Sequence, residues 1–299
     1  MGRHKDRNIC YYDVALLRPV ELALLPSHCL RRGRPSLFSS PLIGSREKEV
    51  ALTERLFVPC TKCQLRAKPL FRPFSSSELD FVSAMKSDHV SLPAKAAIIG
   101  EGEVGGPIYT LFEGWAARYR RLPDGSRQIF DILLAGDMIG LESAMLGTVK
   151  HSVEAITPVT LCTLEGRTLP DLFCEHPALA LSIFRTRIEE EQRADVRLAL
   201  LGRRPAFGRV AYLLVETCDR LRQRGMVNGG TTYHFPLTRR HVADATGLSQ
   251  MHLTRVLKEM RDKRLALIDR AALIVYDWEK LAEIAEYAPV GTVGRRAIL

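Results

Sequence analysis

Gln250 and Arg255, near the C-terminal end of the chain, are side chains of the types that read DNA bases. In the major groove, a Gln side chain can form two hydrogen bonds to adenine and an Arg side chain two to guanine. Leu253 and Val256 recur at helical spacing between and beside them and would form the buried face of the same helix. We therefore predict an amphipathic helix over residues 249–261 whose polar face could enter a major groove.

A second short helix is predicted directly before this one. Thr238 is a suitable N-cap for it, and Ser249 is a suitable N-cap for the following helix. Gly247 lies where the chain must turn between them, and Ala243 is small enough for two helices to cross closely. This combination of caps, turn glycine and apolar spacing is typical of a helix-turn-helix rather than of an ordinary helical hairpin.

The predicted unit offers side chains to both bases and phosphates. Gln250, Met251, Thr254 and Arg255 are expected to face bases, and Arg239, Ser249 and Lys258 are expected to lie near phosphates. A solvated basic face is the alternative explanation for any single Lys or Arg of this unit. The candidate DNA-binding residues are Thr238, Arg239, Ser249, Gln250, Met251, Thr254, Arg255 and Lys258.

Positive charge gathers in the same part of the chain. Of the net charge of +9, residues 203–299 contribute +7, from 17 Lys and Arg against 10 Asp and Glu. Residues 56–202 carry 16 basic against 18 acidic residues, a net charge of −2. The distribution fits phosphate binding by the C-terminal part and excludes a protein that coats nucleic acid with its whole surface.

Composition also limits the compartment. No apolar run reaches the roughly 18 residues that a membrane helix needs, and residues 14–26 are interrupted by Arg18, Pro19 and Glu21. We therefore expect no membrane segment, no export signal and a cytoplasmic protein. The seven cysteines are too sparse and irregular for a secreted disulfide framework, which leaves reduced thiols or a metal site.

The chain divides by composition into five parts, and the fold class expected is α+β. Between residues 92 and 169, short alternating segments separated by glycine turns predict about eight strands, as in a jelly-roll barrel. Residues 265–268 and 273–276 predict a hairpin wing behind the helix-turn-helix. The expected parts are a poorly ordered extension (1–55), the β-barrel domain (56–175), a long helix (176–202), the winged helix-turn-helix domain (203–288) and a tail (289–299).

The long helix suggests a dimer. Pro177 suits its first turn and Gly202 its end, and a helix of that length cannot be packed inside one small domain. Leu181, Phe184 and Leu198 belong to an apolar seam at both of its ends, as in a dimerisation helix. The polar middle, residues 189–195, indicates either a solvated helix face, which we favour, or a weak dimer that is open to control.

An enzyme and a signalling module are the two other classes of function to compare with a DNA reader. An enzyme is not expected, because no Ser/His/Asp constellation, paired carboxylate site or phosphate-cradling glycine loop occurs, and His151, His234 and His241 suit ordinary packing or surface roles. A signalling module whose barrel binds a ligand, without DNA binding, is the alternative from another class. It would bind no duplex in a salt-dependent way.

Barrel, long helix and winged helix-turn-helix in this order resemble the Crp/Fnr family of bacterial transcription regulators. The resemblance covers about residues 56–288 and rests on Glu101-Gly102, Pro123-Asp124-Gly125, Leu134-Ala135-Gly136-Asp137 and the helix-turn-helix from Thr238 to Met260. It implies a homodimer on double-stranded DNA with half-sites about 34 Å apart. It also implies a cyclic-nucleotide-binding-like barrel that senses a signal, a long helix that relays it, and RNA polymerase as a partner.

The chain departs from the cyclic-nucleotide branch of that family. Its members carry a Gly-Glu pair and an Arg-Ser pair in the barrel, and the Arg holds the cyclic phosphate. The matching stretches here read Gly140-Leu141-Glu142 and His151-Ser152. The resemblance therefore implies an effector other than cyclic AMP.

The oxygen-sensing branch holds an iron-sulfur cluster on four cysteines, three near the N-terminus and one in the barrel. Cys60 and Cys63 resemble two of the N-terminal ligands and Cys162 resembles the barrel ligand. The neighbourhood where a third N-terminal cysteine is expected reads Pro69-Leu70-Phe71. Cys29 could supply a fourth thiol. An iron-sulfur redox or oxygen sensor is thus an alternative, and so is Cys162 as a small apolar core residue.

The recognition helix also departs from the family. Members that read TTGA or TGTGA half-sites usually carry Glu where this chain has Met251. A thioether cannot accept a hydrogen bond from a cytosine amine as a carboxylate does. We expect Arg255 to read a guanine and the half-site preference to be altered.

Overall fold

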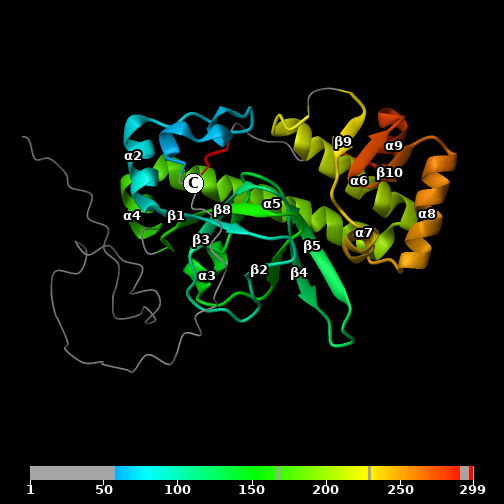
Figure 1. The fold of residues 1–299 in the computed structure, drawn as a ribbon, viewed down its shortest axis with the longest axis horizontal. Coiled ribbons are helices and arrows are strands. Elements are labelled where there is room, and N and C mark those ends of the chain that lie inside the picture. Colours follow the sequence, from blue (N-terminus) through cyan, green and yellow to red (C-terminus); the bar gives the residue numbers. More distant parts are fainter. Residues whose placement is uncertain (1–57, 167–168, 228–229, 290–295, 299) are drawn as a thin grey trace, which may run out of the picture.

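The computed structural model describes residues 58–166, 169–227, 230–289 and 296–298. The extension expected over residues 1–55 lies outside the described residues. Figure 1 shows a β-barrel at one end of the molecule and a small helical unit with its own sheet at the other, with helices α5 and α6 running between them. The fold class is the one expected, and we describe it from the N-terminal side onward.

A short segment of turns precedes the barrel. It contains the 3-10 helices η2 (Cys60–Lys62) and η3 (Gln64–Ala67), followed by the α-helix α2 (Ser76–Met85). Ser75 accepts a hydrogen bond from the Glu78 amide, and the Glu78 side chain accepts one from the Ser75 amide. This reciprocal capping box stabilises the start of α2.

Two four-stranded antiparallel sheets form the barrel, with strand orders β1-β8-β3-β6 and β2-β7-β4-β5. Their inward side chains form the apolar core, which includes Leu111, Ala116, Leu133 and Leu161. The expected jelly roll is confirmed, although β1 and β6 were not predicted. The strands are β1 (Lys86–Leu92), β2 (Ala97–Ile99), β3 (Ile108–Glu113), β4 (Ala116–Arg121), β5 (Arg127–Leu133), β6 (Met138–Ile139), β7 (Ser152–Ala155) and β8 (Val159–Leu164).

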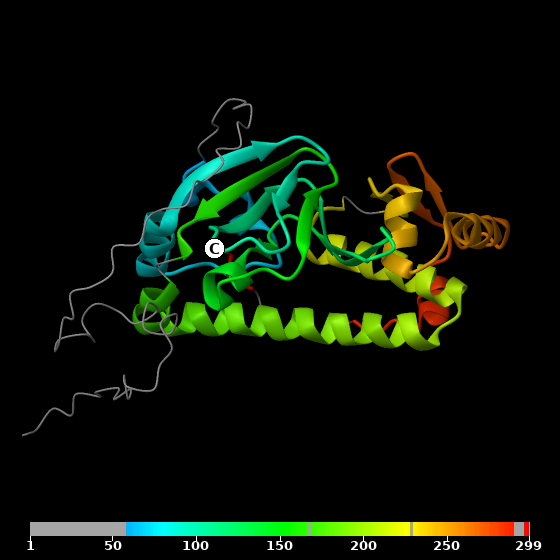
Figure 2. The same ribbon diagram turned by 90° about the horizontal axis from the view of Figure 1, so that it is seen from below.

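The long helix α5 (Pro177–Arg203) follows the short helices α3 (Leu141–Leu146) and α4 (Leu169–Glu175). Figure 2 shows that α5 runs along one side of the molecule beneath both the barrel and the C-terminal unit. Its apolar side chains Leu181, Phe184, Ile188 and Leu198 are exposed. The expected apolar seam therefore lies on the outer face of α5.

The polar middle of α5 is only in part the solvated face that we favoured. Glu189, Glu190 and Arg193 are all at least 90% buried. Arg118 of the barrel lies near Glu190, with its Nη2 3.8 Å from the Glu190 Oε2, and Arg193 lies near Glu216 of the next helix. Glu191, Gln192, Ala194 and Asp195 are exposed, so a solvated face is present on one side of the helix. The prediction was wrong for the three buried residues, because their charged partners come from segments far away in the sequence, which a helical pattern does not reveal.

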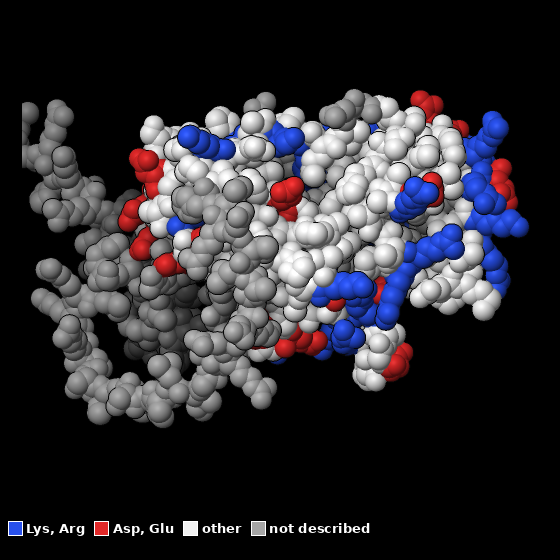
Figure 3. All heavy atoms as spheres, in the orientation of Figure 1, with Lys and Arg blue, Asp and Glu red and all other residues white. Residues whose placement is uncertain are grey.

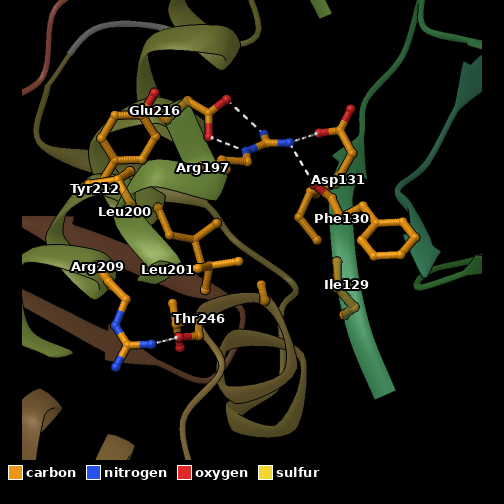
Figure 4. A pocket seen from close by; sticks show the side chains of 13 residues that line it. Ile129, Phe130, Asp131, Arg197, Leu200, Leu201, Arg209, Tyr212, Glu216 and Thr246 are labelled. Carbon is orange, nitrogen blue, oxygen red and sulfur yellow. Dashed lines mark hydrogen bonds and ion pairs between the residues drawn. The ribbon is translucent and has the colours of Figure 1, made fainter. Parts of the chain in front are cut away.

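A buried charge network joins the barrel to α6 (Ala206–Gln223). Arg220 donates to Asp137 at 2.8 Å and to Asp131 at 3.1 Å, and Arg224 donates to Asp137 at 2.5 Å. Arg197 of α5 lies between Asp131 and Glu216, as Figure 4 shows in the pocket formed at this junction. The carboxylates of the barrel thus meet guanidinium groups of both long helices.

These ion pairs determine the charge state of Asp137. Burial alone would raise the pKa of its carboxyl, but the guanidinium groups of Arg224 and Arg220 outweigh it and lower that pKa to about 2. Asp131 follows the same pattern, because Arg197 and Arg220 lower its pKa despite burial. Both carboxylates are therefore ionised at neutral pH, and the network keeps its charges.

The C-terminal end of the chain returns to the barrel. Arg296 forms main-chain hydrogen bonds with Leu70 and Arg72, and its guanidinium donates to Glu189 of α5 at 2.7 Å. Ile298 packs with Leu65 and other apolar residues of the N-terminal segment. Residues expected to form a tail therefore bind the N-terminal segment and the long helix.

The C-terminal unit contains α6, the helices α7 (Arg239–Thr246), α8 (Gln250–Asp262) and α9 (Trp278–Ala285), and a three-stranded sheet. The predicted wing is β10 (Ala266–Asp269) paired with β11 (Ala272–Val275), and an unpredicted strand β9 (Thr232–His234) pairs with β11. Within the described residues, no helix is both long and apolar enough to cross a membrane.

The buried network generates a prediction for stability. Asp137→Asn should destabilise the protein by about 3 kcal/mol or more at pH 7, because it leaves buried guanidinium groups without a counter-charge. A carboxyl whose pKa is lowered on folding stabilises the protein above its unfolded pKa of about 3.9, and this contribution is lost as the pH falls toward about 2. The difference between variant and wild type in urea unfolding should therefore shrink over that range. Exposed Asp80→Asn is the control and should be nearly neutral at every pH.

Candidate nucleic-acid interface

Helix α7 begins with the cap that the sequence predicts. The Thr238 hydroxyl accepts a hydrogen bond from the His241 amide at 3.2 Å, and the His241 Nδ1 accepts one from the Thr238 amide at 3.2 Å. His241 therefore has a structural role in a capping box, which we had not predicted from the sequence. Val242 and Ala243 are buried and hold α7 against the core of the unit.

The turn between α7 and α8 depends on Gly247. Its φ of 63° lies in the left-handed region, where a residue without a Cβ atom is favoured. A Cβ atom at this position would lie 3.4 Å from Cδ2 of Leu201 and 3.5 Å from Nη1 of Arg209. These are ordinary van der Waals distances, so the left-handed backbone conformation, and not lack of space, favours glycine here.

Helix α8 presents the predicted polar face to solvent. Ser249 caps it by accepting a hydrogen bond from the His252 amide at 3.2 Å. Leu253, Val256 and Met260 are buried, as expected. The eight residues that we selected as candidate DNA contacts are all exposed, and five of them share the outer face of α8: Gln250, Met251, Thr254, Arg255 and Lys258.

Two of those side chains are in contact. The Arg255 Nη2 lies 3.5 Å from the Met251 sulfur, one helical turn away, and the Met251 side chain is 69% exposed. Thr238 and Arg239 lie at the start of α7, where they are exposed on the helix that precedes α8. The arrangement leaves the Arg255 guanidinium free to extend from the helix, with an apolar thioether beside it.

The electrostatics of the unit favour an anionic partner. Figure 3 shows Lys and Arg side chains gathered at the end of the molecule that carries α8, whereas acidic side chains gather at the opposite end. Acidic neighbours partly neutralise some of these groups, since Lys263 pairs with Glu259 and Arg261 with Asp262. The exposed basic residues on α7, α8 and the turns that follow α8 and β10 are Arg239, Arg240, Arg255, Lys258, Arg261, Lys263, Arg264 and Arg270.

The unit is held against the barrel through α7. The Arg127 Nε donates to the Asp244 carboxylate at 2.9 Å, and the Gln128 side chain donates to the Ala245 carbonyl at 3.4 Å. Arg127 and Gln128 belong to β5, and Figure 1 shows β5 reaching toward α7. The position of α8 therefore depends on the barrel as well as on the packing within the C-terminal unit.

A second charged cluster lies where the barrel faces α5. Glu142 accepts a hydrogen bond from Arg187 of α5 at 3.2 Å, and the Arg118 Nη1 lies 3.9 Å from the same carboxylate oxygen. Arg187 also pairs with Glu190. The protein's own guanidinium groups therefore neutralise Glu142, the residue that matches the Glu of the Gly-Glu pair in cyclic-nucleotide binders.

The predicted cysteine ligands come together. Cys60 and Cys63 from the N-terminal segment and Cys162 from β8 line one pocket. Burial raises the pKa of the Cys162 thiol to about 12. The sequence analysis missed His89 of β1, whose Nε2 lies 3.0 Å from the Cys162 sulfur. Cys174 and Cys218 line no part of this pocket.

Cys60, Cys63 and Cys162 are the side chains of this pocket that could ligate a metal. In the part of the chain that the structure describes, no three His, Cys, Asp or Glu side chains are placed as they would be around a single metal ion. In a [4Fe–4S] cluster each iron takes its own ligand, so the ligands stand further apart than around one zinc ion, where each sulfur lies about 2.3 Å from the metal. Cys60, Cys63 and Cys162 share their pocket with the cationic side chains of Arg66 and Lys86, and sharing one pocket does not establish the ligand spacing of a cluster.

Two family models match this chain, one in the barrel and one in the C-terminal unit. A family model described as cyclic nucleotide-binding domain matches residues 89–176, and one described as Crp-like helix-turn-helix domain matches residues 208–284. The transcriptional activatory protein AadR of Rhodopseudomonas palustris is 30% identical over 200 residues, which cover 67% of this chain and 82% of AadR. The transcriptional activator protein FnrL of Cereibacter sphaeroides is 27% identical, with 76% of this chain and 91% of FnrL covered.

A solved structure matches the same fold. FixK2 from Bradyrhizobium japonicum aligns with a TM-score of 0.61 at 24% sequence identity, over 68% of this chain and 98% of FixK2. The alignment therefore extends over nearly all of that protein.

The turn glycine generates a prediction. Gly247→Ala should destabilise the protein by about 1 kcal/mol, because alanine is strained in the left-handed region. Gly202→Ala is the matched control, since Gly202 lies in α5 with no atom within 4 Å of an added Cβ, and alanine is favoured in a helix. Thermal unfolding should therefore shift in opposite directions for the two variants. Equal shifts would contradict the role assigned to Gly247.

Proposed function

The chain belongs to the Crp/Fnr family of transcription regulators, and we propose that it acts as a homodimer that reads a two-fold DNA site through α8. The observation that carries the proposal is the outer face of α8, where Gln250, Thr254 and Arg255 are exposed beside a basic surface. An α-helix fits the major groove, and Gln and Arg are side chains that recognise adenine and guanine there. Phosphate contacts from Arg239, Ser249 and Lys258 would position the helix.

The exposed seam of α5 supports the homodimer. Leu181, Phe184, Ile188 and Leu198 are exposed along one helix that lies on the outside of the molecule. An apolar stripe at this spacing is stabilised when a second copy of the helix packs against it. Two copies related by a two-fold axis would place their α8 helices on the two half-sites of a palindromic duplex.

The effector is proposed to be other than cyclic AMP. His151 stands where cyclic-nucleotide binders carry the phosphate-holding Arg, and Arg118 and Arg187 already neutralise Glu142. A ligand that needs Glu142 for its hydroxyl groups would have to displace these guanidinium groups.

Redox or oxygen sensing is a second candidate function. It is favoured by one observation: Cys60, Cys63 and Cys162 line a single pocket although nearly a hundred residues separate the second from the third. These thiols would hold an iron-sulfur cluster, which when bound supplies one-electron redox chemistry and sensitivity to oxygen. The chain's own part would be to hold the cluster between the N-terminal segment and β8.

The remaining expectations follow from DNA reading. A signalling module without DNA binding is disfavoured, since the family is one of DNA-binding transcription regulators. We propose RNA polymerase as a partner and the cytoplasm as the place of action, because a regulator works where the chromosome is transcribed. An enzyme activity is not proposed.

Replacement of Arg255 tests base reading. Arg255→Ala should weaken binding to the preferred duplex by about 1 to 3 kcal/mol and relax specificity at one base position, because a bidentate contact is lost. Lys258→Ala should weaken binding to all sequences alike and reduce the log–log salt slope by about 1. Fluorescence anisotropy titrations on duplexes with single base changes measure both effects.

Lys150→Ala, which removes an exposed charge from the barrel, is the control and should leave the titrations unchanged. Equal affinity of wild type and Arg255→Ala for every duplex would remove Arg255 from the reading face.

Met251 provides a gain-of-specificity test. Met251→Glu should create a preference of about 1 to 3 kcal/mol for a duplex that places a cytosine amine opposite this position, because a carboxylate accepts its hydrogen bond. Met251→Leu is the control, because it is of similar size and offers no hydrogen-bond acceptor. Competition binding on duplexes that differ at one base pair measures the preference, and an unchanged order of preference in Met251→Glu would place residue 251 away from the bases.

A further inference from the structure

A small cavity beside the buried charge network is lined by three guanidinium groups. They belong to Arg193 of α5, Arg220 of α6 and Arg296 near the C-terminal end, and each of these residues is only 4 to 6% exposed. Glu216 is the one carboxylate among the described residues of the wall. The neutral residues of the wall are Tyr212, Gln223 and Tyr287. The cavity adjoins the pocket of Figure 4, with which it shares Tyr212 and Glu216. Positive charge therefore predominates around it.

Two donor atoms of Arg193 have no acceptor. Its Nε and Nη2 are buried and form no hydrogen bond with any residue that the structure describes. Oε1 of Glu216 lies 4.0 Å from the Arg193 Nε, and both oxygens of Glu216 already accept hydrogen bonds from Arg197, at 2.7 and 3.1 Å. Buried polar atoms of proteins nearly always have partners, so this pair of donors points to a water molecule or an ion beside Arg193.

Tyr212 and Arg220 add two more donors to the same wall. The Tyr212 hydroxyl and the Arg220 Nε are also buried and have no partner among the described residues. The terminal nitrogens of Arg220 donate to acceptors of the barrel, which are Asp131, Ile132 and Asp137. Burial raises the pKa of Tyr212 to about 12, so the phenol keeps its proton at neutral pH and can donate. The wall thus has a surplus of hydrogen-bond donors, which an acceptor in the cavity would complement.

The buried charges around the cavity do not balance. Five guanidinium groups meet four carboxylates, which leaves one positive charge in excess. The guanidinium groups are Arg193, Arg197, Arg220, Arg224 and Arg296, and the carboxylates are Asp131, Asp137, Glu189 and Glu216. Burial lowers the pKa of Arg193, and the positive charge of Arg220 lowers it further. A negative charge in the cavity would offset both effects.

We propose that this cavity binds a single anion of about the size of chloride, with Arg193, Arg220 and Tyr212 as its hydrogen-bond donors. The free volume of the cavity is about 10 Å³, which is room for one particle about as large as a water molecule. Chloride is only slightly larger than water and accepts hydrogen bonds from N–H and O–H groups, whereas phosphate and sulfate carry four oxygen atoms. Because the donor atoms are buried in the wall, binding requires small rotations of the Arg193 and Tyr212 side chains. The inference rests on neither of the functions proposed above.

A bound anion would connect three parts of the chain. Arg193 belongs to α5, Tyr212 and Arg220 belong to α6, and Arg296 comes from the C-terminal segment that returns to the barrel. A ligand that binds the folded chain and not the unfolded chain stabilises the fold by mass action. Chloride should therefore stabilise the protein more than its contribution to ionic strength alone would.

The first test locates the ion. Crystals of the full chain are soaked in sodium bromide, because bromide replaces chloride and scatters anomalously, and diffraction data are collected at the bromine absorption edge. We expect a bromide peak in the cavity within hydrogen-bond distance of Arg193 and of Tyr212 or Arg220. A water molecule at that position without an anomalous signal would overturn the proposal, and so would bromide bound only to exposed basic side chains.

The second test measures the effect of chloride in solution. Thermal unfolding of the full chain is followed while sodium chloride replaces sodium gluconate, whose anion is too large for the cavity, at constant ionic strength. The melting temperature of the wild type should rise with the chloride concentration. Tyr212→Phe should need about 10-fold more chloride for the same rise, because it loses a hydrogen bond to a charged group. Arg193→Met should lose the response.

Arg185→Met is the matched control, because Arg185 is an exposed guanidinium of the same helix. It should respond to chloride as the wild type does. Circular dichroism of each variant in gluconate checks that it is folded. An equal response of wild type and Arg193→Met would remove the site from this cavity. No rise in the wild type, or a rise with sulfate and none with chloride, would overturn the proposal as well. DNA binding by α8 and the role of the cysteine pocket are untouched by all of these outcomes.

Discussion

The structure depends on ion pairs buried between the barrel and the two long helices. Asp131 and Asp137 of the barrel accept hydrogen bonds from Arg197 of α5, from Arg220 of α6 and from Arg224, which directly follows α6. Charges removed from water are tolerated only when their partners are in place, and these partners come from three separate parts of the chain. Apolar packing alone is non-directional and would allow the barrel to shift along the helices. Guanidinium–carboxylate hydrogen bonds are directional and therefore specify one arrangement of barrel and helices.

This arrangement determines where the DNA-reading face can be. Helix α6 is the first helix of the C-terminal unit, so the network anchors that unit to the barrel, and Arg127 with Asp244 adds a second contact directly to α7. If the barrel senses a signal, as we propose, these contacts and α5 connect it to α8. The C-terminal residues provide a further link, because Ile298 lines the cysteine pocket and Arg296 pairs with Glu189 of α5.

Local chemistry was readable from the sequence, and long-range chemistry was not. The helix-turn-helix could be predicted because caps at Thr238 and Ser249, the glycine turn and the apolar spacing all lie within one short stretch. Strand β1 was missed because it starts Lys86-Ser87-Asp88-His89, which has no apolar alternation. The contact of His89 with Cys162 depends on the register of β1 with β8, which the sequence alone does not show. Glu189, Glu190 and Arg193 looked solvated because charged residues normally are, and only the folded chain brings their partners to them.

The central claim is that two copies of this chain present two α8 helices to one duplex. The most direct measurement is selection by the wild-type protein from a pool of duplexes with a randomised centre, followed by sequencing of the bound fraction. The account predicts enrichment of two inverted half-sites with centres about 10 base pairs apart. Enrichment of a single unpaired half-site, or of no sequence at all, would contradict it.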